Sequence, residues 1–96
     1  MYGKGTGKGT GKGTVRFAIK PARAAKTVLL SGSFNGWKPV ALRKQKDGTY
    51  AATLGIRPGT YEYKFIVDDE WVVDPDNPTW SMNPYGTFNS VAQVNA

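Results

Sequence analysis

The chain has 96 residues, 40% of them hydrophobic, and its thirteen basic and seven acidic side chains give a net charge of +6. This length predicts a single domain with a small core. The sequence has no cysteine and no histidine, which excludes a disulfide framework, a zinc site built from those residues and catalysis by a histidine base.

The N-terminal segment is repetitive, because residues 3–14 are three copies of Gly-Lys-Gly-Thr. Alternating glycine offers no apolar surface to bury, so we expect a flexible tail over residues 1–14. Each lysine is followed by glycine, so the Gly-x-x-x-x-Gly-Lys-Ser/Thr spacing of a phosphate-binding loop is missing. Lys4, Lys8 and Lys12 lie here, which leaves ten basic residues against seven acidic ones in the rest of the chain. That balance is ordinary and argues against nucleic acid as the partner.

From Thr14 onward, apolar and polar residues alternate as they do in half-buried strands. Pro21 ends the first strand, and Asp47-Gly48 is a strong hairpin signal. The pattern predicts strands over residues 15–20, 27–31, 40–44 and 50–56.

The second half of the chain also reads as β-structure. In a strand over residues 61–67, Tyr63 and Phe65 would face the core, and Lys64 would face outward. Further strands are predicted over residues 71–74 and 89–94, with a proline-rich irregular loop over residues 75–87. Together these elements predict an all-β fold, an immunoglobulin-like antiparallel β-sandwich of about seven strands over residues 15–96.

The acidic residues are the first candidates for chemistry. A glycosidase needs two carboxylates across a cleft, whereas these acids crowd one hairpin and the loop after it, so we do not expect an enzyme. Solvated turn acids are the favoured interpretation. A calcium site formed by Asp68, Asp69, Asp74 and Asp76 stays open as an alternative, because oxygen ligands cluster there.

Two tryptophans, Trp37 and Trp71, each follow a cluster of turn residues. They could be core residues, but other aromatic and aliphatic side chains already supply a core. Exposed indoles would form a platform for a ligand with a broad apolar face, such as a pyranose ring. Trp80 is expected to anchor the proline-rich loop. The polar side chains available to such a ligand are Asn35, Lys64, Asn83, Thr87 and Asn89.

Four motifs occur in order between Val15 and Val94: Ser31-Gly-Ser-Phe-Asn-Gly-Trp37, Tyr63-Lys-Phe-Ile-Val-Asp-Asp-Glu-Trp71, Asp74-Pro75 and Asn83-Pro-Tyr-Gly-Thr-Phe-Asn-Ser-Val91. In these motifs the chain resembles the carbohydrate-binding modules of family 48. That family includes the glycogen-binding domain of the AMP-activated protein kinase β-subunit and the early-set domains of isoamylase and branching enzymes.

The resemblance implies an immunoglobulin-like sandwich that binds α-1,4-glucans. We expect binding without cleavage, and no cofactor or metal. By position, Trp37 and Trp71 match the family's stacking tryptophans, and Lys64 and Asn89 match its hydrogen-bonding residues. Two further residues complete the expected carbohydrate-binding set. Thr87 matches a contact threonine, and Tyr85 stands where the kinase type has a leucine that reaches into the curve of the sugar.

Two other functions are compatible with the sequence. The domain could be a structural or regulatory early-set domain that docks on a separate glucan-active enzyme or kinase. The joint presence of Trp37, Lys64, Trp71 and Asn89 favours glucan binding over that role. Binding of single-stranded nucleic acid is less favoured, because the basic residues outside the tail are not interleaved with the tryptophans. No apolar run is long enough for a membrane span or a signal peptide, so we expect a cytoplasmic protein without a membrane partner.

Overall fold

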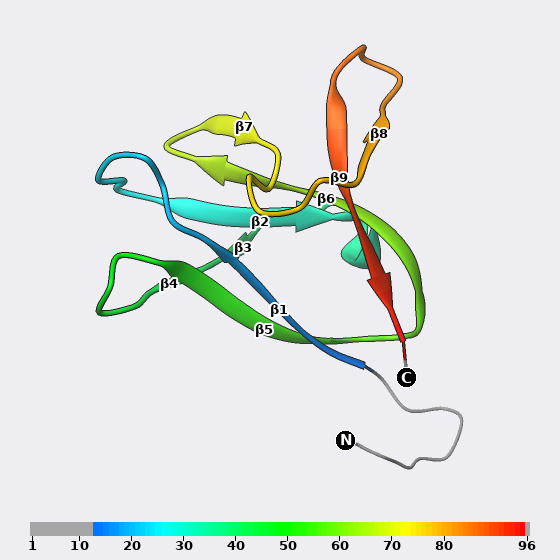
Figure 1. The fold of residues 1–96 in the computed structure, drawn as a ribbon, viewed down its shortest axis with the longest axis horizontal. Coiled ribbons are helices and arrows are strands. Elements are labelled where there is room, and N and C mark those ends of the chain that lie inside the picture. The colour runs from blue at the N-terminus through cyan, green and yellow to red at the C-terminus, as the bar shows by residue number, and fades with distance from the viewer. Residues whose placement is uncertain (1–12, 96) are drawn as a thin grey trace.

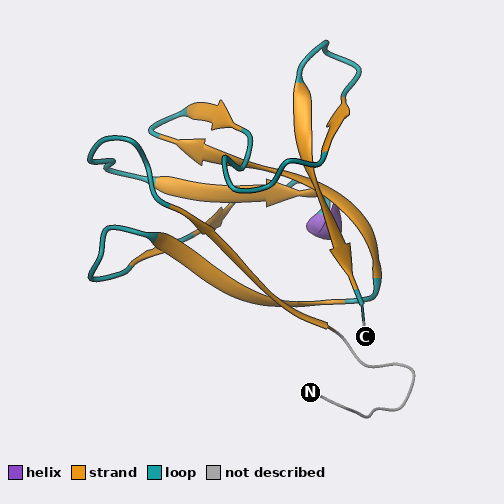
Figure 2. Cartoon of the chain, viewed as in Figure 1, coloured by secondary structure: helices purple, strands orange, loops and turns teal. Residues whose placement is uncertain are grey.

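The computed structural model describes residues 13–95, which form an antiparallel sandwich of two sheets (Figure 1). The described strands are β1 (Gly13–Ile19), β2 (Val28–Gly32), β3 (Val40–Ala41), β4 (Arg43–Lys44), β5 (Tyr50–Ile56), β6 (Gly59–Val67), β7 (Glu70–Val72), β8 (Trp80–Met82) and β9 (Phe88–Val94). One short 3₁₀ helix, η1 (Ser33–Asn35), follows β2, as Figure 2 shows. Within residues 13–95, no helix has the length and apolar character that a membrane span requires.

The smaller sheet has the strand order β1-β5-β4, and the larger has β3-β2-β6-β9-β8, with β7 paired to β6. All neighbours are antiparallel. The architecture confirms the predicted all-β, immunoglobulin-like sandwich, although the structure has nine strands where the sequence predicted about seven.

The core lies between the two sheets and follows the predicted alternation. Phe65 and Leu30 are completely buried. The ring of Phe17 contacts two other rings, those of Phe34 and Tyr63, with centroids 5.4 and 4.9 Å away. The remaining buried apolar residues of this cluster are Ile19, Val28, Leu42, Tyr50, Ile56 and Val94. Because residues 63 and 65 face inward, the side chain of residue 64 lies on the outer face of the larger sheet.

Three predictions of secondary structure need correction. Residues 75–87 are not an irregular loop throughout, because β8 pairs with β9 there. The predicted strand 40–44 is two strands in different sheets, divided at Leu42, whose amide donates to the Val28 carbonyl. The predicted strand 71–74 is β7, which ends at Val72. β1 starts at Gly13, and the tail predicted over residues 1–14 otherwise lies outside the described residues.

A buried polar network secures the chain between β7 and β8. The Tyr63 hydroxyl donates to Asp74 Oδ2 at 2.7 Å, and the Asp74 amide donates to Ser90 Oγ at 2.8 Å. Asn77 Nδ2 donates to the Tyr63 oxygen at 3.1 Å and to the Val91 carbonyl at 2.8 Å. These bonds fix the segment that leads into β8 against β6 and β9. They thereby position the β8–β9 hairpin, which rises clear of the sandwich in Figure 1.

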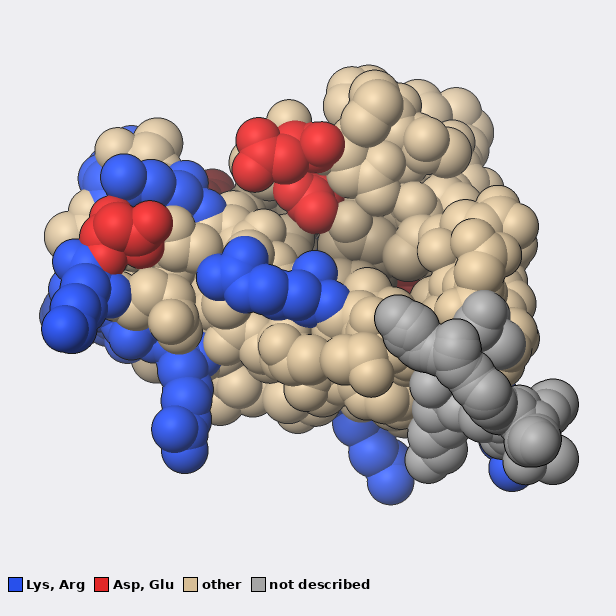
Figure 3. Space-filling view, turned by 60° about the horizontal axis from the view of Figure 1, so that its bottom comes forward, with Lys and Arg blue, Asp and Glu red and all other residues tan. Residues whose placement is uncertain are grey.

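Charged side chains are unevenly distributed over the molecule. In the view of Figure 3, lysine and arginine lie on the left, across the middle and along the lower side, and the upper right, where the β8–β9 hairpin lies, is uncharged. The sequence explains this, because residues 77–96 contain no Lys, Arg, Asp or Glu.

Candidate functional site

A groove of about 740 Å³ lies on the outer face of the larger sheet. The residues that line it come from the turn after η1, from β6 and β7, and from the β8–β9 hairpin. They are Trp37, Lys64, Trp71, Asn83, Pro84, Tyr85, Thr87 and Asn89. The structure therefore brings together all six residues of the predicted set, from segments up to about fifty positions apart in the sequence.

Lys64 lies in the floor of the groove. It pairs with Ser31 across β2 and β6, and it is only 9% exposed although it faces away from the core. Its ammonium donates to Thr87 Oγ1 at 3.2 Å, the one hydrogen bond that it makes among residues 13–95. An ammonium has three N–H donors, so this lysine can also donate to a ligand in the groove.

Trp71 is presented by the tight turn between β6 and β7. Asp68 and Asp69 have φ values of 47° and 71°, as a two-residue type I′ turn requires. Asp68 Oδ1 accepts from the amides of Thr27 and Lys26 at 2.9 and 2.8 Å, and these hydrogen bonds lower the pKa of the Asp68 carboxyl. The indole of Trp71, 54% exposed, is thereby held over the same outer face as Lys64.

Trp37 has an uncommon backbone conformation. Gly36 and Trp37 have φ values of 71° and 64°, in the left-handed region that a bulky residue seldom adopts. Two hydrogen bonds hold it: the Trp37 amide donates to the Gly32 carbonyl, and Ser31 Oγ donates to the Trp37 carbonyl, both at 2.8 Å. The side chain stays 39% exposed at the groove. Strain of this kind is typical of residues that a fold holds in place for binding.

Asn83 organises the loop between β8 and β9. Its Oδ1 accepts from the amides of Tyr85 and Thr87 at 3.0 and 3.1 Å. Its Nδ2 donates to Thr87 Oγ1 at 2.7 Å and to Asn89 Oδ1 at 3.1 Å. The Asn89 amide in turn donates to Glu62 Oε1 at 2.9 Å. The polar side of the groove is thus held in place, while Tyr85 is almost fully exposed at its rim.

The sequence prediction did not include Asn83 and Pro84 in the site, although it named Asn83 as an available polar side chain. The signal was present in the Asn83-Pro84-Tyr85-Gly86 segment, since asparagine before such a turn often bonds to the backbone two residues later. That bond, to Tyr85, is what the structure contains.

Replacing Asn83 with alanine should therefore disturb the groove without unfolding the sandwich. The substitution removes four hydrogen bonds from one exposed loop. We expect the Thr87 and Asn89 resonances to shift and the free energy of unfolding to fall by about 1 kcal/mol. NMR spectra and denaturant unfolding measure the two effects. Unchanged Thr87 and Asn89 resonances would contradict this role of Asn83.

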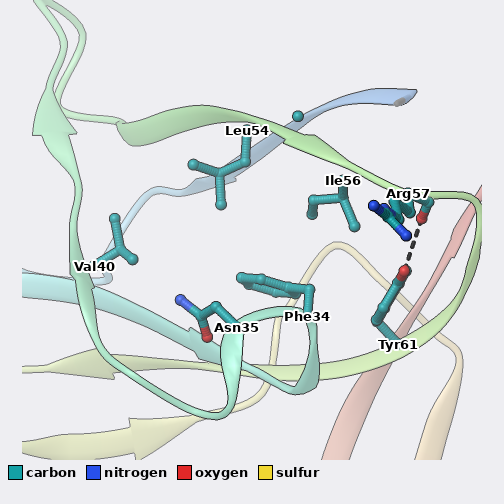
Figure 4. Close-up of a pocket in the computed structure, with 8 residues that line it drawn as sticks. Phe34, Asn35, Val40, Leu54, Ile56, Arg57 and Tyr61 are labelled. Atoms are coloured by element: carbon teal, nitrogen blue, oxygen red, sulfur yellow. Dashed lines mark hydrogen bonds between the residues drawn. The ribbon is translucent and has the colours of Figure 1, made fainter. Parts of the chain in front are cut away.

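Two other residues considered from the sequence lie away from the groove. Trp80 was expected to anchor a loop, and its indole N–H does donate to the Asn77 carbonyl at 3.1 Å, but the residue belongs to β8. Asn35 donates to the Lys38 carbonyl and lines a second, smaller cavity of about 380 Å³ (Figure 4). This cavity opens between η1 and β5, where the Tyr61 hydroxyl donates to the Arg57 carbonyl.

The acidic residues that left a calcium site open do not converge. In the β6–β7 turn, the Asp68 carboxylate accepts hydrogen bonds from the amides of Lys26 and Thr27. Asp74 is buried and accepts a hydrogen bond from the Tyr63 hydroxyl. Within residues 13–95 there is no group of three or more acidic side chains placed to hold a metal ion.

Comparison with known proteins gives consistent matches. A sequence model of a protein family, described as the glycogen recognition site of AMP-activated protein kinase, matches residues 15–96. Protein PTST homolog 2, chloroplastic, from Arabidopsis thaliana is 43% identical over 63 residues, which are 65% of this chain and 12% of that protein. The 5'-AMP-activated protein kinase subunit beta-1 of Sus scrofa is 39% identical over 69 residues, 72% of this chain and 55% of the subunit. The chain thus spans about half or less of the length of these relatives.

Among solved structures, the maltogenic amylase from S. marinus matches with a TM-score of 0.71 and 30% identity, over 93% of this chain and 15% of the amylase. The apo pullulanase from Paenibacillus barengoltzii matches with a TM-score of 0.59 and 22% identity, over 94% of this chain and 15% of the pullulanase. The second of these matches concerns the fold alone.

Proposed function

Since the chain belongs to the family of the glycogen recognition site of AMP-activated protein kinase, we propose that its groove binds α-1,4-glucans such as glycogen, starch and maltooligosaccharides. A member of this family is a non-catalytic recognition module, which binds its ligand without breaking a bond. One observation supports the groove as the binding site. It is lined by two exposed tryptophans, Trp37 and Trp71, and by the buried side chain of Lys64.

The proposed mechanism combines stacking with recognition of hydroxyl groups. The C–H face of a glucose ring would lie on each indole, and an aromatic contact contributes about 0.5–1.5 kcal/mol beyond the burial of apolar area. The Lys64 ammonium and the Asn89 amide would bond to hydroxyls at the edge of the sugar, beside Thr87. Tyr85 at the rim would contact the curve of the chain.

The affinity for short glucans should be modest. The two indoles are exposed at the surface, and two platforms can contact only a few sugar units. We therefore expect dissociation constants between about 1 μM and 1 mM, or about 4–8 kcal/mol of binding free energy.

Titration with oligosaccharides tests this proposal directly. In ¹H–¹⁵N spectra of the full chain, maltoheptaose should shift the indole N–H signals of Trp37 and Trp71 saturably, and glycogen should broaden them. Cellohexaose, a straighter β-linked chain of similar size, should cause much smaller shifts. If maltoheptaose leaves both indole signals unchanged, the proposal fails.

A second candidate role is docking on a separate glucan-active enzyme or kinase. It is favoured by the length of the maltogenic amylase, because the matching region makes up only 15% of that chain. The groove distinguishes the two roles. A docking domain would keep its partner when Trp37, Lys64 and Trp71 are replaced, whereas a glucan-binding module would lose its ligand.

A further inference from the structure

The β8–β9 hairpin has a second face, which points away from the groove. Trp80 pairs with Ser90 and Met82 with Phe88, so these side chains share one face, while Ser81 and its partner lie on the other. That partner is Asn89, a residue of the groove. Trp80, Met82 and Phe88 therefore form an apolar surface on the reverse of the hairpin, which we call the reverse face.

The reverse face is exposed. Trp80 is 54% exposed, and Met82 and Phe88 are also among the exposed large hydrophobic residues. In a sandwich this side of the sheet would normally be covered by the opposite sheet. Here the hairpin rises beyond the smaller sheet, which leaves its tip uncovered (Figure 1).

The Trp80 ring is also held in a fixed orientation. Its Nε1 donates to the Asn77 carbonyl at 3.1 Å, and its ring lies 5.7 Å from that of Phe88 at an interplanar angle of 40°. Asn77 is itself bonded to the buried Tyr63 and to the Val91 carbonyl. The indole is thus attached to the core network, so little side-chain freedom would be lost when a ligand stacks on it.

Charge indicates what kind of ligand the reverse face suits. Residues 77–96 carry no charged side chain, and the hairpin region is uncharged in Figure 3. A nucleic acid or an anionic membrane would be matched by basic side chains, which gather elsewhere on the molecule. A neutral polymer with apolar ring faces fits an uncharged aromatic surface.

We propose that the reverse face is a second glucan contact, used by a neighbouring chain of the same polysaccharide while the groove holds the first. This inference rests on the proposed function of the groove. The two faces belong to one hairpin and meet at its exposed tip, Tyr85, so closely spaced glucan chains could occupy both. Two linked contacts raise the effective concentration of the second, so the protein should prefer glucan polymers to short oligosaccharides.

The first test uses the indole signal of Trp80 as a reporter in the full chain. Saturating maltoheptaose should shift this signal with a weaker dissociation constant than the signals of Trp37 and Trp71. The shift should persist in Trp71→Ala, in which the groove is impaired. If the Trp80 signal does not respond to maltoheptaose, the inference is wrong, and shifts at Trp37 and Trp71 then decide separately whether the proposed function stands.

The second test separates polymer from oligosaccharide. Trp80→Ala should weaken glycogen binding about tenfold or more, through loss of the linked contact. Its dissociation constant for maltoheptaose at the groove should stay within about twofold, because Trp80 is not among the residues that line the groove. Phe88→Thr removes a second ring of the reverse face and places a β-branched residue, which strands favour, at that position. It guards against a folding defect and should act in the same direction.

Arg43→Ala, on exposed β4 of the other sheet, is the control for removal of a large surface side chain and should leave glycogen binding unchanged. Equal glycogen affinity in wild type and in both hairpin variants would overturn the inference. A second pair of results would also overturn it: maltoheptaose does not shift the Trp80 signal of the wild type, and sedimentation shows that Trp80→Ala converts a dimer to a monomer. The reverse face would then bind a second copy of the chain.

Discussion

Replacing Trp71 with alanine is expected to weaken maltoheptaose binding at least about tenfold, which corresponds to about 1.4 kcal/mol. The substitution removes one of the two stacking platforms together with the apolar area that a sugar ring would cover. The fold should remain, because the Trp71 side chain is 54% exposed and its neighbours Phe65 and Val72 keep the β6–β7 pairing. Isothermal calorimetry and ligand titration by NMR measure the loss.

The matched variant is Trp71→Phe, which keeps an aromatic ring of smaller area and should retain part of the affinity. Thermal unfolding of both variants serves as the control for folding. Two outcomes would contradict the prediction. Unchanged affinity in Trp71→Ala would mean that the ring does not touch the glucan, and global unfolding would mean that the ring supports the sandwich.

Raising the pH above 10 is expected to destabilise the protein by about 1.4 kcal/mol per pH unit through Tyr63 alone. Burial raises the pKa of the Tyr63 hydroxyl far above its ordinary value of 10.0, and the hydrogen bond to the Asp74 carboxylate adds to this effect. Above pH 10 the unfolded chain therefore loses a proton that the folded chain keeps. The folded state binds more protons in that range, so the free energy of unfolding falls as the pH rises, whereas below pH 10 this group contributes no slope.

Urea unfolding between pH 9 and pH 12 measures this slope. Tyr63→Phe supplies the comparison, because it keeps the ring in the core and removes the ionisable hydroxyl. This variant should be less stable at neutral pH by about 1–3 kcal/mol, since Asp74 loses a buried hydrogen bond. Its alkaline slope should be shallower than that of the wild type. Parallel curves for the two proteins would show that Tyr63 is not responsible.

Much of the fold followed from local patterns in the sequence. Alternation placed Phe17, Leu30 and Phe65 in the core correctly, because a strand with one buried face repeats every two residues. The errors arose where pairing depends on distant partners. β8 has only three residues and lies between prolines, and it is a strand only because β9 is available beside it. Nothing local marks Leu42 as the point where the chain passes from one sheet to the other.

The candidate site was predicted in its members but not in its arrangement. Side-chain types and the resemblance of four motifs named the six residues, and the structure brings them to one groove. Their contacts with glucan stay a prediction. The bond from Asn83 to the Tyr85 amide is local and could have been read from the turn sequence, whereas the bond to Asn89 could not. The sequence did not indicate that Lys64 is buried, because its burial depends on the position of the β8–β9 hairpin. That position depends on the network around Asp74, which joins residues distant in the sequence.

The left-handed backbone at Gly36 and Trp37 costs free energy when the protein folds, and not when it binds a ligand. Trp37 adopts this unfavourable conformation once, during folding. At that stage Ser31 Oγ donates to the Trp37 carbonyl and the Trp37 amide donates to the Gly32 carbonyl. Each later encounter with a ligand meets an indole that is already in position. A weakly bound polymer can then attach and detach many times without the backbone of this turn having to rearrange.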